Sequence, residues 1–281
     1  MRNAVKFDYP VVEAITSILP LCDEFVVALG NSEDATQELI QAINSPKIKI
    51  VHTVWDDSLR EGGRTFALET DKAFKEISKD SDWAFYIQAD EVVHEKYHAS
   101  VKEAMLRYKD DLKVEGLLFS YSHFYGSYDY IGEAYRWYRR EVRIIRNDPT
   151  IQSYKDAQGF RKQNRKINAK LIDAYIYHYG WVREPKAMQG KQRSFNHFYF
   201  DDQWIENNIS KADQFDYTGI DALKLFEGTH PAVMKRRIES MNWKFDHDIS
   251  RNNFKSKDKI KRFIENLTGW RIGEFRNYKI I

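Results

Sequence analysis

The sequence predicts an α/β fold, in which a mixed β-sheet is flanked by helices and followed by a basic, helical C-terminal extension. Over roughly the first hundred residues, apolar runs of strand length alternate with segments of helical periodicity, which is typical of βαβ units. The chain of 281 residues is long enough for one large domain. Its 42% hydrophobic and 31% charged residues are those of a folded globular protein.

In the first half, turn and breaker residues separate the expected elements. Pro20 ends the first helix, residues 30–32 (Gly-Asn-Ser) form the turn after the first strand, and residues 62–63 (Gly-Gly) precede the third helix. The helices expected from periodicity cover 9–19, 34–43, 64–77 and 95–108. The expected strands cover 24–29, 47–54 and 83–88.

In the second half the alternation decays. Residues 115–122, 136–146 and 173–178 are expected strands without regular crossover helices between them, and they are rich in Tyr, Trp and Arg. We interpret them as mixed sheet and loops that cover a crevice. We expect residues 1–234 to form one domain. Residues 235–281 are the expected basic helical extension, packed on or beside it.

Charge is unevenly distributed, although the net charge is only +2. Residues 235–281 hold 13 Lys and Arg against 6 Asp and Glu, a net charge of +7, which leaves −5 for the rest. Such a tail can contact anionic lipid headgroups or nucleic acid, or it can be a solvated helical face. We favour the solvated face slightly and do not expect a nucleic-acid partner.

Cysteine content and hydropathy restrict the compartment. Cys22 is the only cysteine, so an intrachain disulfide is excluded and cysteine-ligated zinc is not expected. The apolar stretch 11–22 is too short to cross a bilayer, and the N-terminus does not resemble a signal peptide. We expect a cytoplasmic protein whose basic C-terminus can contact the inner face of the membrane.

The expected strand at 83–88 ends in acidic side chains, Asp90 and Glu91. In open α/β sheets ligands bind beyond the carboxyl ends of strands, and crowded carboxylates favour a hard cation between them. The alternative is that these acids only end the strand and begin the helix near Glu95, at its positive end. The segment alone favours neither interpretation.

Four segments in order resemble the family 2 glycosyltransferases of the GT-A fold, a Rossmann-type architecture. They are the strand and acidic turn at 25–36, the segment 55–68, Gln-Ala-Asp-Glu at 88–91, and Arg-Ile-Ile-Arg at 143–146. The resemblance covers roughly residues 1–180 and depends on the order and spacing of these pieces. Residues 88–91 stand where the family has its Asp-x-Asp signature.

The chain departs from this family at three points. Met1 to Ala4 fall where the family's first strand would already have ended, so we expect that strand to be missing, with either a trimmed chain start or a differently built sheet edge. Ala28 and Leu29 replace the acidic pair after the second strand, which puts the identity of the nucleotide in doubt. Gln88 replaces the first acid of Asp-x-Asp; it can still hydrogen-bond a ribose hydroxyl, but it supplies one negative charge fewer for a metal.

The resemblance implies a metal-dependent, inverting glycosyltransferase of hexosyltransferase type in cell-envelope polysaccharide synthesis. It implies Mn²⁺ or Mg²⁺ as cofactor, a nucleotide-diphosphate sugar as donor, and a saccharide or lipid-linked acceptor. The metal ligands it indicates are Asp90 and His178, and the donor-binding residues are Gly30, Asn31, Asp57, Arg64 and Gln88.

An inverting transfer also needs a base for the acceptor hydroxyl. Glu141 is the first candidate and Asp156 the second. Arg139, Arg140 and Arg143 are expected to lower the pKa of Glu141, and so to make it a weaker base, unless it is shielded from them; it can also be a structural residue in a salt bridge. Each of these site residues also has an ordinary structural alternative, such as a surface or ion-paired side chain.

Other functions fit parts of the sequence. The departures at Gln88, at 28–29 and at the expected first strand also describe a degenerate, non-catalytic protein of this fold that binds glycan or a partner. A nucleotidyltransferase of related topology would need a Gly-rich phosphate loop near the N-terminus, which the sequence does not show. Metal-dependent binding of a nucleotide diphosphate distinguishes the enzyme from the binding protein.

Overall fold

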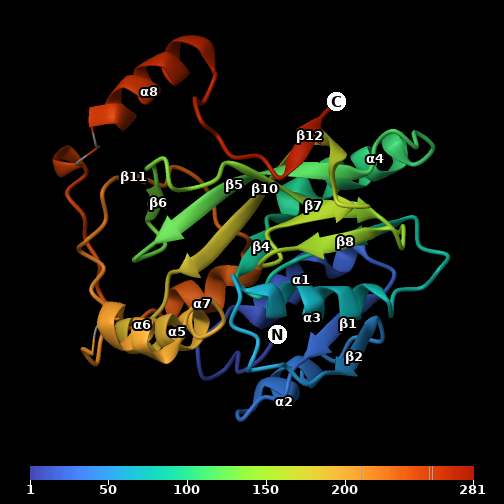
Figure 1. Cartoon of the computed structure of the whole chain (residues 1–281), viewed down its shortest axis with the longest axis horizontal. Coiled ribbons are helices and arrows are strands. Elements are labelled where there is room, and N and C mark those ends of the chain that lie inside the picture. The colour runs from blue at the N-terminus through green and yellow to red at the C-terminus, as the bar shows by residue number, and fades with distance from the viewer. Residues whose placement is uncertain (210, 253, 255) are drawn as a thin grey trace.

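A curled mixed β-sheet flanked by helices forms the centre of the molecule, and one helix stands apart from it (Figure 1). The structure is a computed structural model that describes residues 1–209, 211–252, 254 and 256–281. The helices are α1 (Val11–Ile18), α2 (Thr36–Gln41), α3 (Arg64–Phe74), α4 (His98–Tyr108), α5 (Pro185–Asn196), α6 (Asp202–Asn208), α7 (Lys235–Glu239) and α8 (Ser256–Thr268). Short 3₁₀ turns occupy Leu19–Leu21, Glu95–Tyr97, Ala232–Met234 and Ile249–Arg251.

The strands fall into two sheets. A small sheet holds β1 (Phe25–Leu29) and β2 (Ile48–His52), which pair in parallel. The central sheet holds β3 (Trp83–Phe85), β4 (Glu91–Val93), β5 (Gly116–Tyr125), β6 (Tyr130–Gly132), β7 (Arg140–Arg146), β8 (Ile151–Tyr154), β9 (Gly159–Lys162), β10 (Arg165–Trp181), β11 (Leu223–Leu225) and β12 (Tyr278–Ile280).

Strand β10 is the spine of the central sheet. It pairs in parallel with β5 and β12, and antiparallel with β4 and β9. Strand β5 in turn pairs antiparallel with β6 and β7, and β7 with β3. Because β10 contacts strands from early, middle and late parts of the chain, it brings distant segments together.

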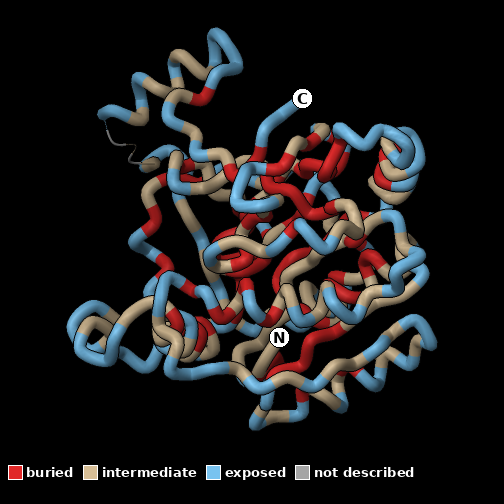
Figure 2. The backbone as a smooth tube through the Cα atoms, turned by 45° about the vertical axis from the view of Figure 1, so that its right-hand side comes forward, coloured by how far each residue is buried: buried red, intermediate tan, exposed pale blue. Residues whose placement is uncertain are grey.

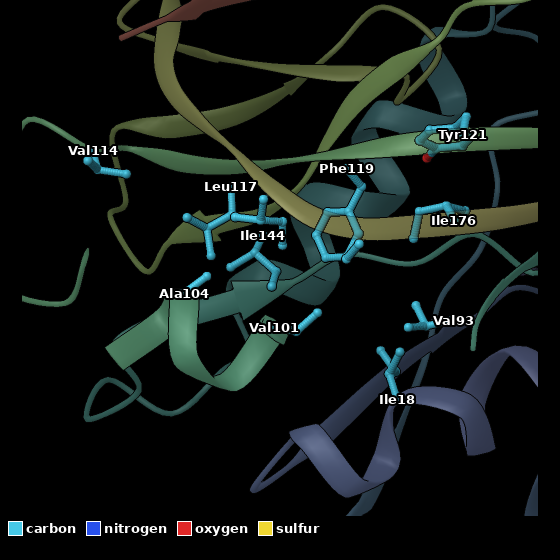
Figure 3. Close-up of a cluster of buried hydrophobic side chains, with 12 residues drawn as sticks. Ile18, Val93, Val101, Ala104, Val114, Leu117, Phe119, Tyr121, Ile144 and Ile176 are labelled. Carbon is cyan, nitrogen blue, oxygen red and sulfur yellow. The ribbon is translucent and has the colours of Figure 1, made fainter. Parts of the chain in front are cut away.

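The largest apolar cluster lies between this sheet and α4 (Figure 3). Val101 and Ala104, one helical turn apart on α4, lie beneath Leu117 and Phe119 of β5 and Ile144 of β7. Residues 117 and 119 share one face of the strand because side chains alternate. The same alternation sends the neighbouring residues of β5 to the opposite face.

Most elements expected in the first half are confirmed within a few residues. The expected helix at 9–19 is α1 followed by a 3₁₀ turn that contains Pro20, and the expected strands at 24–29 and 47–54 are β1 and β2. The expected strand at 83–88 is shorter, because β3 ends at Phe85.

The early strands do not join into one parallel sheet, contrary to the βαβ expectation. Within the described residues β1 pairs with β2, whereas β3 pairs antiparallel with β7. The amino group of Met1 donates to Ala28 O (2.6 Å) and Gly30 N donates to Met1 O (2.7 Å), which is the pattern of a parallel bridge beside Leu29. Among the residues that the structure describes, β1 and β3 are not paired with each other, because a cleft lies between the two sheets.

The C-terminal segment is less helical than expected. It contains α7 and α8, but its end forms β12 and pairs with β10. Tyr278 is buried in an apolar cluster with Ile167 and Phe160, which explains why the chain returns to the sheet. In the described part of the chain, every helix is too short or too polar to span a bilayer.

Candidate functional site

A cleft of 1730 Å³ runs between the small sheet and the central sheet. Of the residues indicated by the sequence, those that line it are Asp57, Gln88, Asp90, Asp156 and His178. Gly30, Asn31, Arg64 and Glu141 are not among the described residues on its wall. The structure therefore brings the two expected metal ligands together with three of the other candidates.

Strand pairing explains how Asp90 and His178 meet. Asp90 ends the link between β3 and β4, and β4 pairs antiparallel with β10 so that Glu91 lies opposite His178. The amide of Tyr179 donates to Asp90 O at 2.8 Å. Gly180 follows, and a Cβ at this position would lie 2.5 Å from His178 Nε2 and 2.9 Å from Asp90 Oδ2. The glycine thus leaves room for these two side chains to approach.

Basic groups surround the carboxylate of Asp90. Its Oδ2 lies 3.3 Å from Lys191 Nζ on α5 and 3.7 Å from Arg183 Nη2. Burial alone would raise the pKa of Asp90, but the positive charges of Lys191 and Arg183, and of His178 in the acid range where it is protonated, outweigh burial and hold that pKa well below its ordinary value. Asp90 is therefore a permanent anion beside the cleft. Burial lowers the pKa of Lys191 to about 8, with a further contribution from Arg183.

The hydrogen-bond network assigns the tautomer of His178. His123 Nε2 lies 2.8 Å from Tyr138 O, a carbonyl that only accepts, so the proton of His123 is on Nε2. Its Nδ1 then accepts from His178 Nδ1 at 3.0 Å. Burial lowers the pKa of both histidines, so both are neutral near pH 7. His178 Nε2 consequently presents a lone pair toward Asp90 Oδ1, 3.8 Å away.

Two electron-pair donors thus face each other with no proton between them. Their separation of 3.8 Å is shorter than two metal–ligand bonds of roughly 2.1 Å each, so both can reach one divalent ion. The described residues hold no group of three or more His, Cys, Asp or Glu placed for a metal. Asp90 and His178 are therefore the two side chains that this chain would offer to such an ion.

Glu91 does not stand at the rim of the cleft, contrary to the expectation. It is fully buried, and both of its carboxylate oxygens accept from Arg143, at 2.7 and 2.8 Å. Tyr121 OH donates a further bond of 2.7 Å. Strand β4 turns Glu91 into the interior, because side chains alternate and Asp90 takes the cleft side. The acidic motif and the Arg-Ile-Ile-Arg element are thus joined by a buried ion pair.

Glu141 is a buried residue of β7 and has a raised pKa, not the lowered one expected from its arginine neighbours. Burial raises the pKa of Glu141 to about 7, more than Arg143 lowers it. Its Oε1 accepts from Gln158 Nε2 (3.0 Å) and Asn277 Nδ2 (3.2 Å). Arg139 is directed elsewhere and pairs with Glu265 and Glu274 of the C-terminal segment.

Asp156, the second candidate base, lies at the cleft and accepts a hydrogen bond of 3.0 Å from Tyr199 OH. Of the two carboxylates named as bases, it is the one with access to a ligand. Gly63 lies directly against it, since a Cβ there would be 2.7 Å from Asp156 Cβ.

The expected donor-binding residues have diverse surroundings. Asp57 pairs with Arg2 at 2.6 Å, and Gln88 Nε2 donates to Tyr86 OH at 3.3 Å. Arg64 is exposed at the start of α3. Asn31 Oδ1 accepts from the amide of Trp55 at 3.4 Å, and a Cβ on Gly30 would lie 2.4 Å from Trp55 Nε1. Asn31 and Gly30 therefore hold Trp55 in place, Asn31 through the backbone amide of Trp55 and Gly30 through close contact with its ring.

Sequence reasoning missed an aromatic wall and three basic groups. The wall consists of Trp55, Phe66, Phe195, Phe198 and Tyr199, whose rings contact one another along the cleft. The basic side chains are Lys191, Arg183 and His123. His123 shares one face of β5 with Tyr121 and Tyr125, because the three occupy every second position of the strand, and this spacing is visible in the sequence. Lys191 lies on α5, beyond the part of the chain that resembles the family.

Comparison with protein-family models finds no match for this chain. Comparison with curated proteins also finds none. The functional conclusion therefore depends on the geometry of the cleft and on the resemblance in its motifs.

Proposed function

We propose that this chain is a GT-A-type, family 2 glycosyltransferase that moves a sugar from a nucleotide-diphosphate donor to a glycan or lipid-linked acceptor in cell-envelope polysaccharide synthesis. The observation that carries the proposal is the Asp90–His178 pair. An anionic oxygen and a neutral imidazole nitrogen lie 3.8 Å apart beside a large cleft, in the segment that resembles Asp-x-Asp.

The surroundings of the pair suit a diphosphate. Asp90 Oδ1 and His178 Nε2 would hold Mn²⁺ or Mg²⁺, which when bound neutralises charge on the leaving diphosphate. Lys191 adds a fixed positive charge at the cleft wall, and its proton is retained below about pH 8. Because a diphosphate gains negative charge as the sugar leaves, positive groups already in place stabilise that state.

The rest of the cleft fits the other parts of the substrates. The aromatic wall offers flat apolar faces for a base or a sugar ring. Asp156 is the carboxylate with access to an acceptor hydroxyl, and we assign it the role of the base in an inverting transfer. Gln88 lies on the cleft wall, where its amide can meet a ribose hydroxyl.

One observation favours a second candidate, a non-catalytic protein that binds glycan or a partner. Asp90 already has two cationic neighbours, Lys191 and Arg183, which neutralise its charge without any metal. In such a protein the cleft would take ligands that do not depend on a divalent ion.

A thermal-shift screen of nucleotide diphosphates and nucleotide sugars, with and without Mn²⁺, tests the proposal. A ligand at 100 times its dissociation constant stabilises the fold by about 2.7 kcal/mol, which is a clear shift in Tm. We expect one nucleotide diphosphate to stabilise the chain more in Mn²⁺, and Asp90→Asn to lose that increment.

The matched control is Asp110→Asn, which removes an exposed carboxylate outside the cleft lining and should retain the full shift. Circular dichroism checks that both variants are folded. Ligand binding that is identical with and without Mn²⁺, in wild type and Asp90→Asn alike, would support the non-catalytic candidate.

A further inference from the structure

Helix α8 presents its apolar face to solvent. Ile260, Phe263 and Leu267 recur at helical spacing along one side, and their exposed fractions are 65%, 65% and 70%. Trp270, just beyond the helix, is 59% exposed. Both views show α8 projecting from the body (Figures 1 and 2), and in Figure 2 its backbone tube has the colours of intermediate and exposed residues. An amphipathic helix on a globular protein normally packs this face inward.

Specific polar contacts hold the opposite face of α8 against the body. Arg262 pairs with Glu133 at 2.8 Å, while Glu265 pairs with Arg139 at 2.7 Å and accepts a hydrogen bond of 2.5 Å from Tyr135 OH. All three partners lie in the segment that leads from β6 to β7. The outward direction of the apolar face is therefore fixed by ion pairs and hydrogen bonds to a defined surface.

The charges of α8 are sorted between its two sides. Helical periodicity places Lys257 and Lys259 along the borders of the apolar face, whereas Lys261 lies on the body side, with its Nζ 5.4 Å from the centre of the Tyr135 ring. The acidic residues Asp258 and Glu265 lie on the side turned toward the body. A surface made of an apolar stripe with lysine borders complements an interface that is apolar within and anionic at its edge.

We propose that α8 docks this protein on an anionic lipid bilayer, with Ile260, Phe263 and Leu267 inserted among the acyl chains and the border lysines among the headgroups. At 13 residues the helix is about 20 Å long, so it lies along the interface and does not cross it. Helix α8 itself has four Lys and Arg against Asp258 and Glu265, a net charge of +2, which adds attraction to the same surface. The inference is independent of the activity proposed for the cleft.

Co-sedimentation of the full chain with vesicles tests this. Vesicles of phosphatidylcholine with about 30% phosphatidylglycerol are compared with vesicles of pure phosphatidylcholine. We expect binding to the anionic vesicles and little to the neutral ones. Ile260→Ser, Phe263→Ser and Leu267→Ser combined should reduce the partition coefficient on the order of 100-fold or more.

A matched triple variant controls for lost surface hydrophobicity. Val54→Ser, Leu112→Ser and Leu225→Ser change exposed apolar residues on other elements, and this variant should bind vesicles like the wild type. Lys257→Glu with Lys259→Glu should weaken binding by at least about fivefold for each lysine removed. Thermal denaturation of each variant checks that it is folded.

Three outcomes would overturn the proposal. In the first, the wild type does not bind anionic vesicles. In the second, the variant with Ile260→Ser, Phe263→Ser and Leu267→Ser binds them as well as the wild type, so that charge alone would explain the binding. In the third, light scattering shows that the wild type forms oligomers and that the same variant does not. The last result would assign the apolar face to a second copy of the chain or to another protein surface.

Discussion

Glu141 offers a test that connects burial, protonation and stability. Its side chain is 1% exposed, and its Oε2 has no hydrogen-bond partner among the described residues. Burial raises the pKa of Glu141 from an ordinary 4.5 to about 7. At roughly 1.4 kcal/mol for each pH unit, this difference corresponds to about 3 kcal/mol.

The sign follows from where the proton is held. Below pH 4.5 Glu141 is protonated in both states, and between pH 4.5 and 7 the unfolded chain releases the proton while the folded chain keeps it. The free energy of unfolding therefore falls as pH rises through that range, and the loss persists above pH 7. Glu141→Gln cannot ionise and should escape this loss.

Urea denaturation of wild type and Glu141→Gln at pH 4 and pH 8 measures the effect. Relative to the wild type, we expect the variant to gain about 3 kcal/mol in free energy of unfolding between the two pH values. Since Glu141 lies off the described cleft wall, the variant should also bind nucleotide like the wild type. A difference between the two proteins that does not change with pH would refute a raised pKa.

Three further predictions concern the site and its support. Gly180→Ala should lower the free energy of unfolding in urea by about 1–3 kcal/mol and weaken nucleotide binding in calorimetry, because its Cβ would overlap His178 and Asp90. The control Gly219→Ala, where a Cβ meets open space, should change neither quantity. Equal behaviour of the two variants would contradict the packing around Gly180. Arg143→Met should lower the free energy of unfolding by about 3–5 kcal/mol, because it leaves Glu91 buried and unpaired. The double variant Arg143→Met with Glu91→Met should lose less stability. A double variant as unstable as the single one would argue against a stabilising Arg143–Glu91 ion pair. Nucleotide-diphosphate affinity should fall as pH rises through about 8, where Lys191 loses its proton, and calorimetry of Lys191→Gln should show no such fall between pH 7 and 9; the same pH profile in both proteins would remove Lys191 from the site.

Local patterns predicted the early elements well, since periodicity and breaker residues are properties of neighbouring positions. Which strand pairs with which could not be predicted in this way. Strand β10 runs over 17 residues, whereas the sequence indicated 173–178, and it pairs with strands from four separate parts of the chain. The expectation of a parallel sheet was wrong for β3 because partner choice depends on segments far away in the sequence.

The site shows the same division between local and distant information. Asp90 and His178 were found from motifs and meet in the structure, but Lys191 and Arg183 reach Asp90 only through folding. The pKa of Glu141 was predicted in the wrong direction because adjacent arginines are visible in the sequence and depth of burial is not. Whether these residues perform sugar transfer stays a prediction.

The cleft also has a consequence for colloidal behaviour. Strands β1 and β3 both line it, and within the described residues each has a ladder partner on one edge, apart from the bridge at Met1. Open strand edges next to apolar side chains are templates for intermolecular pairing. Concentrated solutions of the empty protein should therefore be prone to β-mediated aggregation, and any molecule that fills the cleft should slow it by shielding those edges.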